Sequence, residues 1–254
     1  MTGPEGRLRS ATMLQSYWQA SRAHRYSLAF ALPLLALYET LAALVPHEPG
    51  IGVRNGADVI LRTFFFAVAG AWGPLLFEVS LIGFGCWLVL RDVRRHGAGL
   101  HPCVFAGMLT ESALLALAFG TVVGAATRLV LSPLTSLAAP AAETLDWWTR
   151  LMVSLGAGLY EELLFRVVLV AALAYLGRRV FGWRPLIAGV AATLVSALVF
   201  SAYHYIGPYG DQLRLPSFVF RLIGGLFFSA LYLLRGFGIT EWTHALYGVF
   251  LLAV

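Results

Sequence analysis

The sequence predicts an all-α protein, a polytopic transmembrane helical bundle of about seven, at most eight, spanning helices. Of its 254 residues, 59% are hydrophobic and 12% are charged, whereas a soluble domain carries about 25% charged residues. Several apolar runs reach the ~20 residues that a helix needs to cross a bilayer. We therefore expect one membrane-embedded bundle and not two soluble domains.

The expected elements follow in chain order. A polar, arginine-bearing segment, residues 1–26, has no cleavage site of small residues close behind it, so we expect a retained first helix and not a cleaved signal peptide. The run 57–72 precedes Pro74, which should interrupt a helix, so this run is either an interfacial helix or half of a kinked span. Segment 132–149 is expected on the outer face. Spanning helices are expected at about 27–46, 74–90, 104–131, 150–176, 185–205, 216–235 and 239–254.

The basic residues indicate orientation in a membrane. All 18 are arginines, the net charge is +5, and the clusters at 7–25, 91–95, 178–184 and 235 flank apolar runs. Arginines beside spans are typical of cytoplasmic loops and anionic lipid, so we expect no nucleic-acid partner. We predict a multi-pass protein of the plasma (inner) membrane with its N-terminus in the cytoplasm.

Two adjacent glutamates, Glu161 and Glu162, lie in the middle of the apolar run 150–176. A carboxylate at that depth is costly and is a functional-site hypothesis by default. Arg166 follows Glu162 at i+4, so the two share a helix face and can pair. Glu161 is rotated about 100° away and lacks this partner, which suits it to proton transfer. The alternative is one structural ion-pair network that holds both glutamates.

Two histidines stand apart from those of the termini and loops. His204 ends the fifth expected helix, on the face of Phe200, and His244 lies in the last. Taken alone, each is more typical of an interfacial or capping residue. The expected spans put His204 near the outer membrane face and His244 near the inner one. They can meet only if a late helix is broken, tilted or re-entrant, and the expected places are Gly207–Pro208 and Gly224–Gly225.

Two histidines and a glutamate also form a known zinc ligand set. Glu161, His204 and His244 would supply it from three different helices. The usual HExxH helix is absent, so the sequence requires no metal, and zinc stays open as a cofactor.

The ordered motifs resemble those of the CAAX protease and bacteriocin-processing (CPBP) family of intramembrane proteases, which includes the type II CAAX prenyl endopeptidases. The motifs are Glu-Glu-x-x-x-Arg, Phe-x-x-x-His and a late His, here Glu161–Glu162–Arg166, Phe200–His204 and His244. The resemblance covers about residues 150–254. It implies a CPBP-like catalytic helical core there, after a polar segment at 1–26 and amino-terminal transmembrane helices with an outer-face segment at 27–149.

The resemblance implies an intramembrane endopeptidase. Glu161 would be the general base that activates water, and Glu162 and Arg166 would orient it. His204 and His244 would position the water or stabilise the oxyanion. No cofactor is required in this interpretation. The implied partners are the lipid bilayer and a protein or peptide substrate, with or without a lipid modification.

The chain departs from the family at one position. The third motif usually has Asn four residues after its His, and Gly248 stands there. Asn55, the only Asn of the chain, is expected in a distant loop. Tyr247, Thr243 or a bound water are candidates to replace the missing amide, which would help to hold water or an oxyanion.

This departure leaves two other function classes open. One is a non-catalytic membrane scaffold or immunity protein with the same fold. The other, less favoured because no matching half-sequences are visible, is a small transporter. Its polar pathway would use Glu39, Glu78, Glu111 and Arg221.

Overall fold

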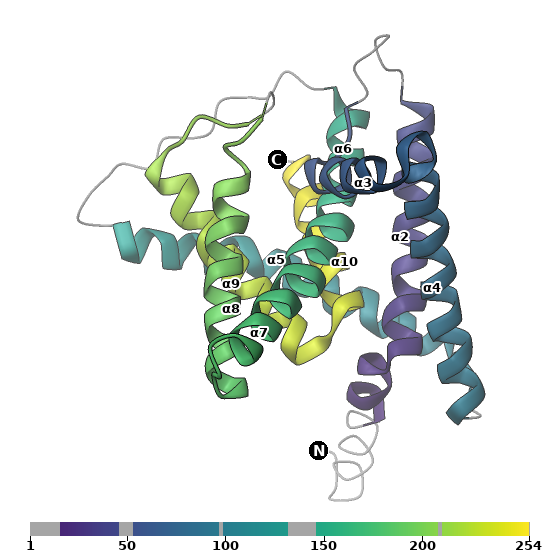
Figure 1. Cartoon of the computed structure of the whole chain (residues 1–254). Coiled ribbons are helices and arrows are strands. Elements are labelled where there is room, and N and C mark those ends of the chain that lie inside the picture. The colour runs from purple at the N-terminus through teal and green to yellow at the C-terminus, as the bar shows by residue number, and fades with distance from the viewer. Residues whose placement is uncertain (1–15, 46–52, 97–98, 132–145, 208–209, 254) are drawn as a thin grey trace, which may run out of the picture.

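The described residues of the chain are helical, with short connections between helices and no strand among them. The computed structural model describes residues 16–45, 53–96, 99–131, 146–207 and 210–253. The expected segments 1–26 and 132–149 are thus described only from residue 16 and residue 146, and Pro208 lies outside the described residues. The all-α bundle is confirmed. Besides residues 16–22, its helices are α2 His24–Leu44, α3 Gly56–Ala69, η1 Gly70–Trp72, α4 Gly73–His96, α5 Pro102–Leu131, α6 Trp147–Gly156, η2 Ala157–Glu161, η3 Leu163–Leu169, α7 Val170–Arg179, α8 Pro185–Tyr203, α9 Leu215–Arg235 and α10 Phe237–Leu251 (Figure 1).

Helix α3 lies crosswise to α4 and does not continue its axis (Figure 1). The turn η1 between them begins at Gly70, whose φ of 59° lies in the left-handed region. At Gly73, a Cβ atom would lie 2.3 Å from the carbonyl oxygen of Phe65, so this reversal requires glycine. The crosswise arrangement fits the interfacial alternative for this run, and it brings the start of α3 against η2.

Helix α10 is the centre of the bundle and packs against α2, α5, α6, η2 and α9. Its approach to η2 is very close, because a Cβ at Gly158 would lie 2.4 Å from the backbone oxygen of Glu241 and 2.6 Å from the Cβ of Ala245. Small residues let membrane helices approach in this way. The helix that carries His244 therefore lies directly against the segment that carries both glutamates.

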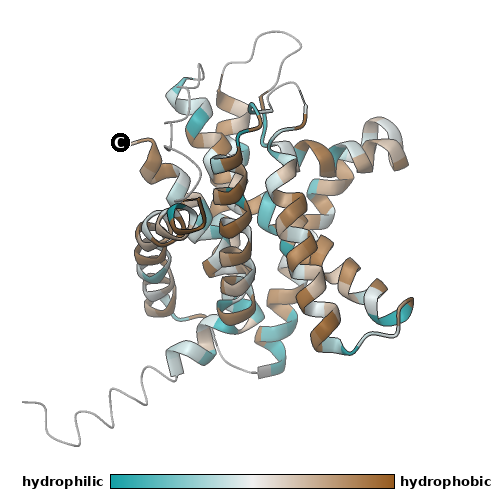
Figure 2. Cartoon of the chain, turned by 90° about the vertical axis from the view of Figure 1, so that its left-hand side faces the viewer, coloured by the Kyte–Doolittle hydropathy of each residue, from teal (hydrophilic) through white to brown (hydrophobic). Residues whose placement is uncertain are grey.

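Five helical segments of the described chain are long and apolar enough to cross a membrane: His24–Leu44, Gly56–Arg95, Pro102–Leu131, Pro185–Tyr203 and Leu215–Arg235. Hydrophobic residues predominate along these helices (Figure 2), and many of their large hydrophobic side chains are exposed, as expected for a surface in contact with lipid. The expected spans 150–176 and 239–254 are helical but fall outside this set. The first is divided among α6, η2, η3 and α7, and α10 has only 15 residues.

The expected break at Gly224–Gly225 is wrong, because α9 continues through both residues. Gly225 instead allows close packing on α8, where its Cβ would lie 3.2 Å from the Cα of Ala197. The chain reverses at Gly236, whose φ is 83°, between α9 and α10. His244 then lies in the middle of α10, while His204 caps the end of α8.

Candidate functional site

The segment that carries the two glutamates is π-helical on both sides of Glu162. Segment η2 ends at Glu161 and η3 begins at Leu163. After η3, the N–H of Val170 donates to the carbonyl of Phe165, five residues earlier. Such turns are rare and occur mostly at functional sites. The sequence did not predict them, because the helix periodicity on which the expectations rest assumes 3.6 residues per turn.

Glu161 faces both intramembrane histidines. Its side chain is buried, and its Oε2 atom has no hydrogen-bond partner among the described residues. Oε2 lies 3.9 Å from Nε2 of His204 and 4.0 Å from Nε2 of His244. These distances are too long for direct hydrogen bonds, but they suit groups that share one water. The structure thus brings together three residues from η2, α10 and the end of α8.

Hydrogen bonds at Nδ1 orient both imidazoles. Nδ1 of His204 lies 2.8 Å from the carbonyl oxygen of Phe200. A carbonyl only accepts, so this nitrogen carries the hydrogen. Nδ1 of His244 lies 2.8 Å from Oε1 of Glu162, and the ring of Phe228 stacks on His244 with centroids 4.3 Å apart. With Nδ1 held in this way, each ring turns its Nε2 toward Glu161.

Glu162 and Arg166 form a buried ion pair, as their i,i+4 spacing indicated. Nε of Arg166 lies 3.2 Å from Oε2 of Glu162, and both side chains are at most 2% exposed. Nη2 of Arg166 also donates to the carbonyl of Gly225 at 3.3 Å. The other oxygen of Glu162 contacts His244, so this ion pair orients the histidine. The sequence had instead led us to expect that Glu162 and Arg166 orient Glu161.

Asn55 is the site residue that sequence reasoning missed. It caps the start of α3 and is buried, and its Nδ2 donates to Oε1 of Glu161 at 2.9 Å. The description of Asn55 as a distant loop residue is therefore wrong in space, although 106 positions separate it from Glu161. The only local signal was an Asn before a helical run, which is typical of an N-cap.

The positions near the missing amide on α10 face other helices. The ring of Tyr247 packs on Phe119 of α5 with centroids 4.5 Å apart. The hydroxyl of Thr243 donates to the carbonyl of Ile239 within its own helix, at 2.7 Å. A Cβ at Gly248 would lie 2.8 Å from the Cβ of Ser154 on α6. The amide beside Glu161 thus comes from α3 and not from α10.

The arrangement of Glu161, His204 and His244 does not fit a tetrahedral zinc ion. Zinc lies about 2.0–2.1 Å from such ligand atoms, which places them roughly 3.3–3.4 Å apart in a tetrahedron. The two Oε2–Nε2 distances of 3.9 and 4.0 Å are wider. The side chains would have to move together before they could hold zinc.

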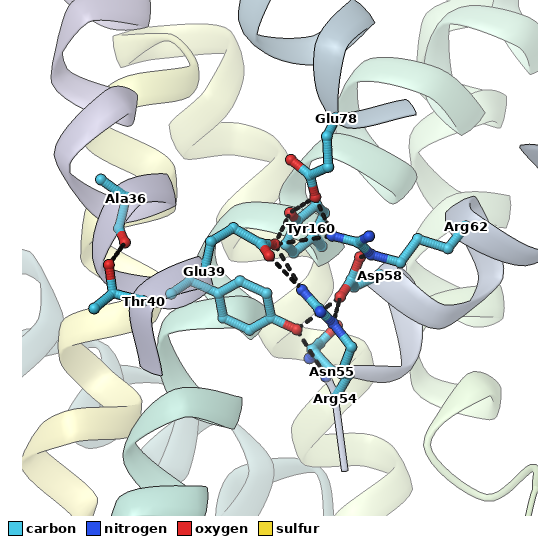
Figure 3. Close-up of polar contacts among 10 residues, drawn as sticks. Ala36, Glu39, Thr40, Arg54, Asn55, Asp58, Arg62, Glu78 and Tyr160 are labelled. Carbon is cyan, nitrogen blue, oxygen red and sulfur yellow. Dashed lines mark hydrogen bonds and ion pairs between the residues drawn. The ribbon is translucent and has the colours of Figure 1, made fainter. Parts of the chain in front are cut away.

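The residues of the transporter alternative belong to three separate ion-pair groups. Figure 3 shows the first, in which Glu39, Glu78 and Asp58 surround Arg54 and Arg62. Their carboxylate oxygens lie within 4.8 Å of one another, but two arginines compensate them, so we interpret the cluster as an ion-pair network. In the other two groups, Glu111 pairs with Arg235 and Arg221 with Asp211.

Comparison with family models matches residues 143–250 to the Rce1-like type II CAAX prenyl endopeptidases. This region contains every residue of the three sequence motifs but not Asn55. No curated protein and no solved structure matches the chain. Together with the five apolar helices, the match indicates an integral membrane protein. Over residues 143–250, less than half of its length, the chain is similar to the Rce1-like type II CAAX prenyl endopeptidases.

Proposed function

We propose that the protein is an intramembrane endopeptidase. It uses a water molecule activated by a glutamate to hydrolyse a peptide bond of a membrane-associated protein or peptide. One observation carries the proposal. The buried Oε2 of Glu161, which has no hydrogen-bond partner among the described residues, faces Nε2 of both His204 and His244 at 3.9 and 4.0 Å. A water between these atoms would lie within reach of the carboxylate base and of both imidazole Nε2 atoms.

The reaction needs only the groups of this site. Oε2 of Glu161 accepts a proton from the water while the water oxygen bonds to the carbonyl carbon of the scissile peptide. The tetrahedral intermediate carries the negative charge on the former carbonyl oxygen. Glu161 then returns the proton to the leaving nitrogen as the C–N bond breaks. A positioned acid–base group of this kind contributes about 10²–10⁴-fold to a rate.

The two histidines have different partners and therefore different roles. In the proposed reaction, His244 acts as an imidazolium that carries a hydrogen on both Nδ1 and Nε2 and keeps both throughout, and the carboxylate of Glu162 behind it stabilises this charge. His244 in that form donates to the oxyanion. His204 has only the neutral carbonyl of Phe200 behind it and holds the water. Glu162 and Arg166 position His244.

The membrane arrangement follows from the arginines. The starts of α2 and α8 and the end of α4 lie at the same end of the bundle (Figure 1). Eight arginines of the described residues lie beside these points: Arg22, Arg25, Arg91, Arg94, Arg95, Arg178, Arg179 and Arg184. This supports a cytoplasmic N-terminus in the plasma (inner) membrane. The substrate is a peptide with or without a lipid modification. Residues 150–254 would form the catalytic core, supported by the helices of 27–149.

The test uses purified protein in proteoliposomes and a library of membrane-bound peptides, with and without a prenyl group. Mass spectrometry should detect cleavage by the wild type, no effect of a chelator, and loss of cleavage in Glu161→Gln. Glu111→Gln is the matched control, because Glu111 is another carboxylate within an apolar helix but lies outside the site, where it pairs with Arg235 at 2.6 Å. A wild type that cleaves no peptide would favour the non-catalytic scaffold, the alternative that Gly248 supports. Loss of cleavage on chelation would assign the reaction to a metal.

A further inference from the structure

We propose that Asn55, at the start of α3, is a positioning residue of this site. It holds one oxygen of the Glu161 carboxylate so that the other faces the two histidines. The inference rests on the proposed function and extends the site beyond the matched region 143–250 into the amino-terminal half. One of the three residues that surround the Glu161 carboxylate would then come from outside that region.

Asn55 uses both ends of its amide. Oδ1 accepts from the N–H of Ala57 at 2.9 Å, which caps α3, and Nδ2 donates to Oε1 of Glu161 at 2.9 Å. Ser or Asp would satisfy the cap equally well. Among short side chains, only the amide of Asn combines such an acceptor with a separate N–H donor. Capping therefore does not explain this residue, whereas a donor to Glu161 does.

Asn55 is itself held in place by the network of Figure 3. Its backbone N–H donates to the hydroxyl of Tyr38 at 3.2 Å, and that hydroxyl donates to Oδ2 of Asp58 at 2.8 Å. Asp58 is fully buried and accepts from Nε of Arg54 at 2.5 Å and Nε of Arg62 at 2.6 Å. A functional group supported in this way has little freedom to move away from its partner.

The start of α3, which carries Asn55, is closely packed against neighbouring helices. A Cβ at Gly156, in the last turn of α6, would lie 2.7 Å from the Cβ of Asn55. A Cβ at Gly56 would lie 2.1 Å from the hydroxyl of Tyr203, next to His204. The start of α3 is thus inserted between α6 and the end of α8. With Oε1 of Glu161 bound to Asn55, Oε2 is the oxygen that remains for the histidines.

Two variants test the role, because each keeps a helix cap and removes the amide donor: Asn55→Ser and Asn55→Asp. Loss of a hydrogen bond to a charged group predicts a kcat that is about ten- to hundredfold lower. KM should stay within about twofold, because Asn55 acts through Glu161 and makes no substrate contact. The matched control is Ser196→Ala. It removes another buried hydrogen bond, 2.8 Å to the carbonyl of Phe165 in η3, and should lower Tm without this loss of kcat.

A second measurement needs no activity. The infrared band of the Glu161 carboxylate can be identified because it disappears in Glu161→Gln. The frequency of this band should shift in Asn55→Ser and stay unchanged in Ser196→Ala. A wild type that cleaves peptides together with Asn55 variants of unchanged kcat, or an unshifted band, overturns the inference but leaves the proposed function intact. A fall in kcat that Ser196→Ala shares makes the role structural and overturns it too. If the wild type cleaves nothing, the proposed function fails, and the band alone decides whether Asn55 holds the carboxylate.

Discussion

Removal of the Arg166 side chain should destabilise the protein although the proposed general base is untouched. Its guanidinium lies 3.2 Å from Glu162 and 4.4 Å from the ring centre of Phe200. In Arg166→Ala, the fully buried Glu162 keeps only His244 as a partner. Breaking a buried ion pair lowers the free energy of unfolding by about 3–5 kcal/mol, because the remaining charge is uncompensated.

Thermal unfolding of the purified protein, followed by tryptophan fluorescence, measures this effect. For a chain of this size, about 2–4 °C of Tm corresponds to 1 kcal/mol, so Tm should fall by roughly 6–20 °C. Glu161→Gln is the control and should change Tm little, since the new carboxamide oxygen still accepts from Asn55. Replacing both partners, Glu162→Leu with Arg166→Met, should recover much of the loss. An Arg166→Ala protein with wild-type Tm would refute the assignment of the buried pair as a stabilising element.

Two further outcomes follow from the structure. Gly248→Asn should lower Tm without raising turnover. The new Cβ would lie 2.8 Å from the Cβ of Ser154, and overpacking of this kind lowers the free energy of unfolding by about 1–3 kcal/mol. A stable and faster Gly248→Asn enzyme would count against the observed packing of α10. Bonds from the hydroxyl and N–H of Thr149 lower the pKa of Asp146, the N-cap of α6. The contribution of Asp146 to stability is therefore complete above the ordinary aspartate pKa of about 3.9 and is lost as pH falls through the lower folded value. Hydrogen-exchange protection of the first turn of α6 should fall at acidic pH in the wild type but not in Asp146→Asn, and equal behaviour of the two proteins would contradict this cap.

Local periodicity predicted the part of the site that is local in sequence. The i,i+4 spacing indicated the pair of Glu162 with Arg166, and the structure has it. The same spacing could not assign the second oxygen of Glu162 to His244, because that contact spans 82 positions. The π-helical turns were equally inaccessible, since no residue type specifies them and they appear only in the packed bundle.

Long-range geometry depended on where the chain reverses. The sequence placed a break at Gly224–Gly225, but these glycines serve close packing, and the reversal lies at Gly236. Expected helix ends placed the two histidines at opposite membrane faces, yet both lie about 4 Å from Glu161. The contact between Asn55 and Glu161 could not be predicted for a related reason. The sequence shows that Asn55 can cap a helix, but the crosswise packing of α3 decides which other segment Asn55 contacts.

The most direct test of the proposed mechanism is the kcat/KM of Glu161→Gln relative to the wild type, on the library peptide that the wild type cleaves fastest. The substitution keeps the shape of the side chain and the acceptor for Asn55, but it removes the base. We expect kcat/KM to fall by at least about 10²-fold, with Tm within a few degrees of the wild type. A Glu161→Gln protein that folds equally well and cleaves the same bond at a similar rate would contradict the assignment of Glu161 as the base.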